Sequence, residues 1–252
     1  MCIGQLQALK SEGLRPATMR EIMEQVVHWV DCQRWDFLSH WQGSVDTGDS
    51  VLYKPGLGRS APMIKVVSQS PSLSRVDYGA ALKPDYVQQW AGSLVLRHSV
   101  YEEAGGEEFS LDDVERYANT PLTRSDAEAN PLWLALAGGD SNLLRAYAKV
   151  LDALFGDSGM MRFSVFTGGP HATLVERLVC FTGLNAKSNV SARNLGSLSG
   201  AGRFVGLPID LEAFLAQQSG DGVDTDEGAD AATAASQAGG KARVNQDLKK
   251  VA

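Results

Sequence analysis

The stretch TMREIMEQVVHWVDC, residues Thr18–Cys32, carries the first strong helix signal in the chain. Thr18 and Glu21 stand three residues apart, which is the spacing of a capping box. In that motif a hydroxyl and a carboxylate bond the free amides at the start of a helix. The sequence therefore predicts a helix over residues 19–32. Its apolar residues recur with a helical period on one face, and they are Met19, Ile22, Met23, Val26, Val27 and Val30.

A second amphipathic helix is predicted over residues 142–155, capped by Asp140 or Ser141 and stopped by Gly156. Shorter helices are expected from their caps, from prolines at a first helical position or from their apolar content. They cover residues 34–42, 84–90, 111–118 after the Ser110 cap, 131–137, 170–182 and 209–217.

Strands are expected to be few and short. Val51–Lys54, Met63–Val67 and Met160–Phe166 each read as a strand, and the β-branched residues of Leu94–Tyr101 favour strand over helix. The rest of residues 44–62, together with 185–203, is predicted to be loop because Gly, Ser, Asn, Asp and Pro dominate it.

These elements predict a helix-rich α+β fold with a few short strands, in a single globular domain spanning residues 1–217. Residues 218–252 are Gly, Ala, Asp, Ser and Gln with almost no large apolar side chain. Such a segment cannot bury enough surface to offset its ordering entropy. We therefore predict a disordered, charged C-terminal tail.

Composition limits the class of protein. The longest apolar run, Leu132–Ala137, is far below the roughly 20 residues of a membrane span, and the first residues hold no apolar signal core. Cys2, Cys32 and Cys180 cannot all pair, which favours a reduced, cytoplasmic protein. The net charge of −7 argues against a general polyanion binder.

The charge is unevenly distributed along the chain. Residues 101–140 hold ten acidic and two basic side chains, whereas residues 159–208 hold five basic and one acidic. Both segments could be solvated faces that cancel within one fold. Alternatively, the acidic segment of one copy meets the basic segment of another, or the basic segment forms a groove for phosphate.

Several catalytic and metal-binding patterns are incomplete in this sequence. Lys187 lacks the glycine that a phosphate loop needs before it, residues 200–206 are one residue too long for a dinucleotide loop, and no Gly-x-Ser-x-Gly occurs. His171 and Cys180 would lie on opposite faces of the helix predicted there. We expect no catalytic residue, metal or cofactor. The polar face of the first helix holds Glu21, Glu24, His28 and Cys32. His28 and Cys32 stand four residues apart, a spacing that can chelate a metal, but polar residues are expected on this face of an amphipathic helix in any case.

Two segments remain as candidate anion sites. In the first, a strand, two glycines and a helix start follow one another, so free amides could meet a phosphate; its residues are Thr167, Gly168, Gly169 and His171. In the second, bases spaced among small residues suit phosphate contacts and an aromatic ring could stack on a base. That segment spans 185–206 and contributes Lys187, Arg193, Arg203 and Phe204.

Two functions fit these observations. The first is a non-enzymatic assembly or binding protein, such as a structural protein of a virus or mobile element. It would join its own copies or other subunits and contact nucleic-acid phosphates through residues 185–206. No membrane is expected among its partners. The second is an enzyme acting on a phosphate-bearing small molecule at the turn 167–171, with His171 as acid or base. The absence of a catalytic constellation favours the first.

Overall fold

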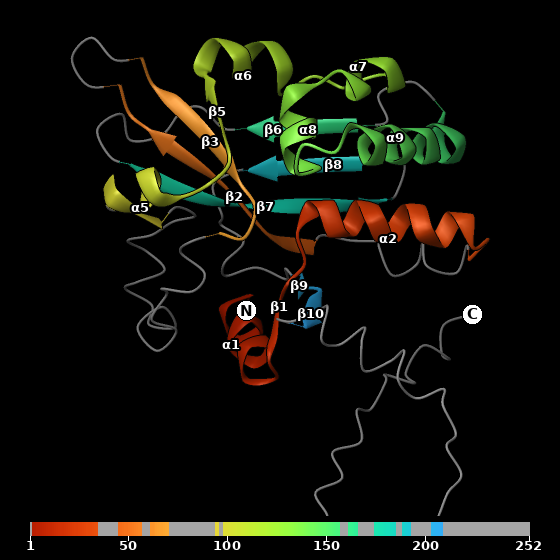
Figure 1. Ribbon diagram of the computed structural model, residues 1–252, viewed down its shortest axis with the longest axis horizontal. Helices are drawn as coiled ribbons and strands as arrows, with labels where there is room; N and C mark the ends of the chain where they lie inside the picture. Colours follow the sequence, from red (N-terminus) through yellow and green to blue (C-terminus); the bar gives the residue numbers. More distant parts are fainter. Residues whose placement is uncertain are drawn as a thin grey trace, which may run out of the picture. The chain divides into compact units, whose positions relative to one another are not determined.

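An eight-stranded sheet forms the centre of the protein in the computed structural model (Figure 1). The described residues all belong to one unit, Met1–Leu211. They are 2–34, 45–56, 61–70, 94–95, 98–156, 161–165, 174–184, 188–192 and 203–208.

The described helices and strands have the following bounds. The helices are α1 (Cys2–Ser11), α2 (Met19–Asp31), α5 (His98–Glu103), α6 (Leu111–Tyr117), α7 (Arg124–Glu128), α8 (Pro131–Leu136) and α9 (Ser141–Phe155). The strands are β1 (Leu14–Pro16), β2 (Val45–Lys54), β3 (Met63–Val67), β4 (Leu94–Val95), β5 (Glu107–Ser110), β6 (Met161–Val165), β7 (Val175–Leu184), β8 (Ser188–Ala192), β9 (Arg203–Phe204) and β10 (Gly206–Pro208).

The strands of the main sheet run in the order β5-β3-β2-β7-β8-β6, with β4 pairing to β7 and β9 to β2. Most neighbours are antiparallel, but β6 lies parallel to β8, and β9 parallel to β2. A separate two-stranded sheet joins β1 to β10, so residues 14–16 pair with residues 206–208. This pairing connects the beginning of the described chain to its end.

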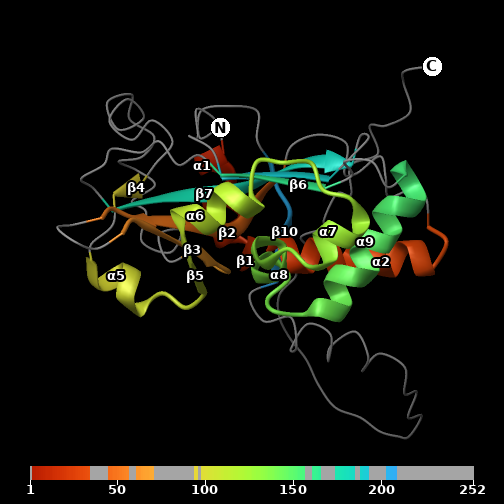
Figure 2. The same ribbon diagram turned by 90° about the horizontal axis from the view of Figure 1, so that it is seen from above.

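Helices α2, α8 and α9 cover one face of the main sheet (Figures 1 and 2). Side chains from these helices and from strands β2, β3, β5, β6, β7 and β8 form one buried cluster, in which Trp133 packs edge-on against Phe163 with ring centroids 6.5 Å apart. The burial of so much apolar surface is the main favourable contribution to the stability of this unit.

The opposite face of the sheet is more polar. Leu52, Val67 and Tyr101 form a small apolar cluster there, with Leu174 at its margin. Beside it, the buried Lys65 ammonium donates to the carbonyls of Tyr101, at 3.0 Å, and Ala104, at 3.1 Å. This face therefore relies on buried hydrogen bonds as well as apolar contacts.

Four of the predicted helices and two of the predicted strands are confirmed. Helix α2 begins after Thr18, and both halves of its capping box form. Ser110 caps α6, Pro131 opens α8 and Asp140 caps α9. Strands β3 and β6 fall where the sequence predicts strands.

The helix predicted over residues 170–182 is wrong, because Val175–Leu184 form the long central strand β7. Leu174, Val175 and Leu178 resemble a helical stripe, but β7 lies between β2 and β8 and is buried on both faces. A strand covered on both faces loses the polar alternation that identifies strands in sequence.

Three other predictions need correction. The loop predicted from residue 44 is wrong beyond Val45, because the strand expected at Val51–Lys54 begins there. Within the predicted strand 94–101, residues 94–95 form β4, but residues 98–101 belong to helix α5. The loop predicted over 185–203 contains β8.

The helix-rich fold class is therefore wrong: the sheet organises the described chain, and the helices pack on it. The helices predicted at 34–42, 84–90 and 209–217 lie largely or wholly outside the described residues, as does the tail 218–252. Among the helices that the structure describes, none has the length and apolar character needed to cross a membrane.

Candidate functional site

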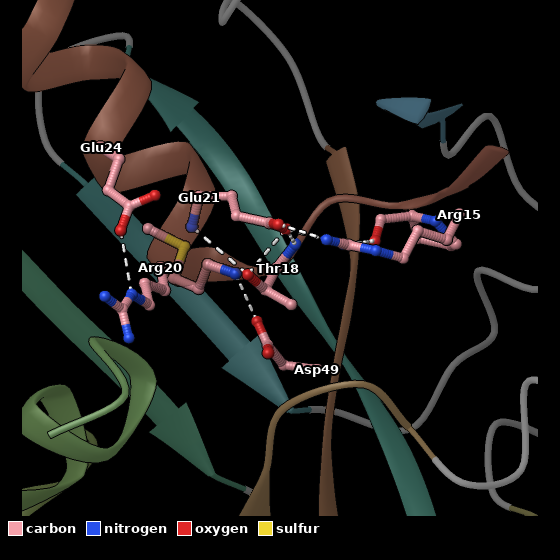
Figure 3. Close-up of polar contacts among 8 residues, drawn as sticks. Arg15, Thr18, Arg20, Glu21, Glu24 and Asp49 are labelled. Carbon is pink, nitrogen blue, oxygen red and sulfur yellow. Dashed lines mark hydrogen bonds and ion pairs between the residues drawn. The ribbon is translucent and has the colours of Figure 1, made fainter. Parts of the chain in front are cut away.

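A connected polar network surrounds the first turn of α2 (Figure 3). The carboxylate of Glu21 accepts hydrogen bonds from the Thr18 amide at 2.8 Å and the Thr18 hydroxyl at 2.9 Å. Two guanidinium nitrogens of Arg15 donate hydrogen bonds to the same carboxylate, one of them at 2.9 Å. Burial alone would raise the pKa of Glu21, but the hydrogen bonds from Arg15 and Thr18 outweigh it and lower that pKa.

Asp49 joins this helix end to the sheet. Its carboxylate accepts a hydrogen bond from the amide of Met19, the first residue of α2. The residue is 1% exposed, and burial raises its pKa to about 7, although hydrogen bonds from Met19, Ser68 and Thr47 oppose the rise. The helix end is thus held by a carboxyl group that titrates near neutral pH.

The same network supports the last described segment, 203–208. The Ala17 amide, just before the Thr18 cap, donates to the Val205 carbonyl at 2.8 Å. Arg203 is the register partner of Val45 at the start of β2. The C-terminal part of the predicted 185–206 interface is therefore anchored to β1 and β2.

The parallel pair β6–β8 anchors the other end of that interface. Val165, the last residue of β6, is the register partner of Ala192, the last residue of β8. Partners on neighbouring strands lie about 5 Å apart. Strands β6 and β8 therefore end at adjacent positions of the sheet. In the sequence, Thr167 comes two residues after Val165 and Arg193 comes directly after Ala192.

Asn119 fixes the outer edge of β6 at this point. Its side-chain amide donates to the Val165 carbonyl at 3.1 Å, and its side-chain oxygen accepts from the Val165 amide at 3.2 Å. Its own amide donates to the Phe163 carbonyl at 2.8 Å. The side chain thus replaces a neighbouring strand and covers an edge that would otherwise be free to pair.

The structure describes part of the predicted site. Arg203 and Phe204 form β9, and the half-buried Phe204 donates its amide to the Gln5 side chain at 3.3 Å. The remaining predicted residues lie outside the described ranges: Lys187, Arg193, Thr167, Gly168, Gly169 and His171.

Two charges of the basic segment belong to the interior. Glu176 and Arg177 lie on β7 and are 0% and 1% exposed. Arg177 stacks over the Tyr53 ring, 4.7 Å from its centroid, and Glu176 accepts a hydrogen bond from Ser70. Since one charge of each sign is buried, the rest of segment 159–208 keeps its net charge of +4.

Part of the acidic segment is neutralised within the fold. Glu102 pairs with Lys54 at 2.8 Å, and Glu108 pairs with the buried Lys65 at 3.2 Å. Glu128 pairs with Arg124 at 2.9 Å. These three acids pair with bases of the same chain. This supports the interpretation that part of the acidic segment is neutralised within the fold, so that not all of it is available to bind another copy.

Sequence reasoning missed Arg15, Asp49 and Asn119 as structural anchors. Arg15 lies six residues before Glu21, and Asp49 and Asn119 reach partners 30 and 46 residues away. No local spacing identifies such pairs. Within the described ranges, no three His, Cys, Asp or Glu side chains gather in a way that could hold a metal ion.

Comparison with known proteins identifies the fold. No protein-family model and no curated protein matches the sequence. A solved structure from work on the accommodation of massive sequence variation in Nanoarchaeota by the C-type lectin fold is similar, with a TM-score of 0.53 and 10% identity. The match covers 80% of this chain and 89% of that chain. The likeness establishes a mixed fold similar to that of C-type lectins, and it too corrects the helix-rich prediction.

Proposed function

We propose that this chain is a non-enzymatic binding protein whose sheet presents the basic segment 185–206 to nucleic-acid phosphates. The observation that carries the proposal is the anchoring of this segment at Ala192 and at Arg203, each paired to a neighbouring strand. Fixed ends lower the entropy that the ten intervening residues lose when they bind a ligand.

The register favours cooperation between the two candidate anion segments. Val165 and Ala192 are register partners at the same end of β6 and β8, and residues 167–171 and 193 follow them closely in the sequence. Amides at a glycine-rich turn and a guanidinium beside them are both good phosphate ligands. A phosphate bound at this end could therefore contact both segments.

The number of residues between two bases of the segment limits their spacing. Lys187 precedes Ser188 and Arg193 follows Ala192, so the two bases stand six residues apart, which is at most about 20 Å at roughly 3.3 Å per residue. One nucleic-acid strand carries a phosphate about every 3.4 Å along a duplex axis, so this separation spans at most about six phosphates.

The fold likeness supports a binding role over an enzymatic one. The similar Nanoarchaeota protein comes from work on massive sequence variation accommodated by its fold. A scaffold that tolerates varied residues is suited to recognition surfaces, whereas catalysis needs a fixed constellation. In the described part of this chain, two of the buried acids, Asp49 and Glu176, bond Met19 and Ser70 and so serve the scaffold.

Nucleic-acid binding is tested by fluorescence anisotropy with labelled single-stranded and duplex oligonucleotides across a salt series. Arg193→Ala with Arg203→Ala should weaken binding and reduce the slope of log affinity against log salt by about 0.7–0.9 for each phosphate that the variant no longer neutralises. Lys149→Ala, which removes an exposed charge from α9, is the matched control.

Two outcomes would reject this function. One is affinity that does not depend on salt; the other is a double variant that binds like Lys149→Ala. Circular dichroism of each variant separates a binding defect from unfolding, since Arg203 lies in β9. Turnover of a phosphate-bearing small molecule that depends on His171 would favour the enzyme alternative.

A further inference from the structure

A thiol and an imidazole lie side by side at the C-terminal end of α2. The Cys32 sulfur is 3.7 Å from Nε2 of His28 and 4.0 Å from Nδ1. Both residues are exposed, and Cys32 forms no disulfide. They stand four residues apart, so they share one face of the helix.

The separation of these atoms matches that of two ligands on one zinc-class ion, meaning Zn²⁺ or a divalent ion that shares its tetrahedral coordination. Zinc–sulfur bonds are about 2.3 Å and zinc–nitrogen bonds about 2.0–2.1 Å, arranged tetrahedrally. At a tetrahedral angle these lengths place sulfur and nitrogen about 3.6 Å apart. The observed distance of 3.7 Å needs almost no rearrangement to accept the ion.

The described side chains nearby leave this pair incomplete. Glu24, one turn before His28, is held by Arg20 at 2.9 Å (Figure 3). Within the part of the chain that the structure describes, no third His, Cys, Asp or Glu completes a metal-binding group. A closed structural zinc site takes four ligands, so two must come from elsewhere.

We propose that His28 and Cys32 form half of a tetrahedral zinc-class site, which a second copy of this chain completes with the same two residues. A twofold axis through the ion brings the same surface of each copy into contact and gives two sulfur and two nitrogen ligands. This set is one that zinc prefers in structural sites. The inference does not depend on the nucleic-acid proposal, because it concerns a different element and a different ligand.

The test is a titration of the full chain with Co²⁺, a coloured probe for zinc sites, in a phosphine reductant that prevents disulfides. We expect saturation at half an ion per chain, with a thiolate-to-cobalt absorption band and tetrahedral visible bands. Light scattering should report a doubling of the mass, and EDTA should reverse both changes.

Variants identify the ligands. Cys32→Ser and His28→Ala should each abolish the thiolate-containing tetrahedral spectrum and the dimer, with unchanged circular dichroism, because both residues are exposed. Cys2→Ser and Cys180→Ser are the matched controls and should leave both signals intact. One ion per monomeric chain, a metal-independent dimer, or a spectrum that survives in Cys32→Ser would overturn the proposal.

Discussion

Replacing Asp49 with asparagine should change how the stability of the protein depends on pH. The carboxyl group is 1% exposed and bonds the amide of Met19, and burial raises its pKa from 3.8 to about 7. Because the folded-state pKa lies above the unfolded value, the stability that this group contributes is complete below pH 3.8. That contribution is lost as the pH rises through 7.

The size of the effect follows from the two pKa values. With 3.8 in the unfolded chain and about 7 in the folded one, Asp49 should lower the free energy of unfolding by about 2–3 kcal/mol between pH 5 and pH 8. Asparagine keeps an oxygen for the Met19 amide but carries no charge. From pH 5 to pH 8, the free energy of unfolding of the Asp49→Asn variant should therefore fall by about 2–3 kcal/mol less than that of the natural protein.

Urea unfolding of both proteins at pH 5 and pH 8 gives the change in the free energy of unfolding between these pH values for each protein. The contributions of the other titrating groups cancel when the two changes are compared. Glu115→Gln removes an exposed carboxylate from α6 and serves as the control for the loss of one negative charge. If Asp49→Asn shifts stability equally at the two pH values, the buried carboxyl does not titrate as argued and the reasoning fails.

Two further predictions concern the sheet edges. Asn119→Gly keeps the backbone conformation, with φ at +66°, but loses both side-chain hydrogen bonds to Val165. It should destabilise the protein by about 1–3 kcal/mol and speed hydrogen exchange at the Val165 amide. Unchanged exchange at this amide would contradict the role given to Asn119. Gly106→Ala should cost roughly 3 kcal/mol or more in thermal unfolding, because φ is +114° and a Cβ would overlap the Val66 carbonyl. Gly105→Ala, with nothing within 4 Å of its added carbon, should stay within about 0.5 kcal/mol, and equal losses at the two glycines would refute the steric argument.

Helices α2, α6, α8 and α9 were predictable because their signals are local. The box of Thr18 and Glu21 lies within four residues, and the Asp140 side chain bonds the amides of Asn142 and Leu143. Such contacts form between near neighbours whatever the rest of the chain does. An expectation based on them survives even when the fold class is wrong.

The central strands were not predictable for the opposite reason. The start of β2 reads as loop because Asp46, Thr47, Gly48, Asp49 and Ser50 are polar or small. Two of these buried residues have distant hydrogen-bond partners: the Thr47 hydroxyl donates to the Val179 carbonyl at 2.9 Å, across 132 residues, and the Asp49 carboxylate accepts from the Met19 amide, across 30 residues. A buried polar strand can be recognised only when its partners are known.

The candidate interface shows the same division. Its composition was readable, since bases and small residues follow one another from Lys187 to Arg203. Its anchoring was not, because the pairs Val165–Ala192 and Val45–Arg203 depend on the order of strands in the sheet. The spacing of His28 and Cys32 was visible in sequence, but their 3.7 Å separation is what makes them a metal-site candidate.

The topology also ties the proposed binding segment to the start of the chain. The segment ends in β9, which pairs with β2, and continues into β10, which pairs with β1. Strand β1 carries Arg15, whose pairing with Glu21 is continuous with the cap of α2. Because these contacts join residues far apart in the sequence, the interface cannot be separated from the scaffold as a fragment. Its geometry depends on the whole sheet being folded.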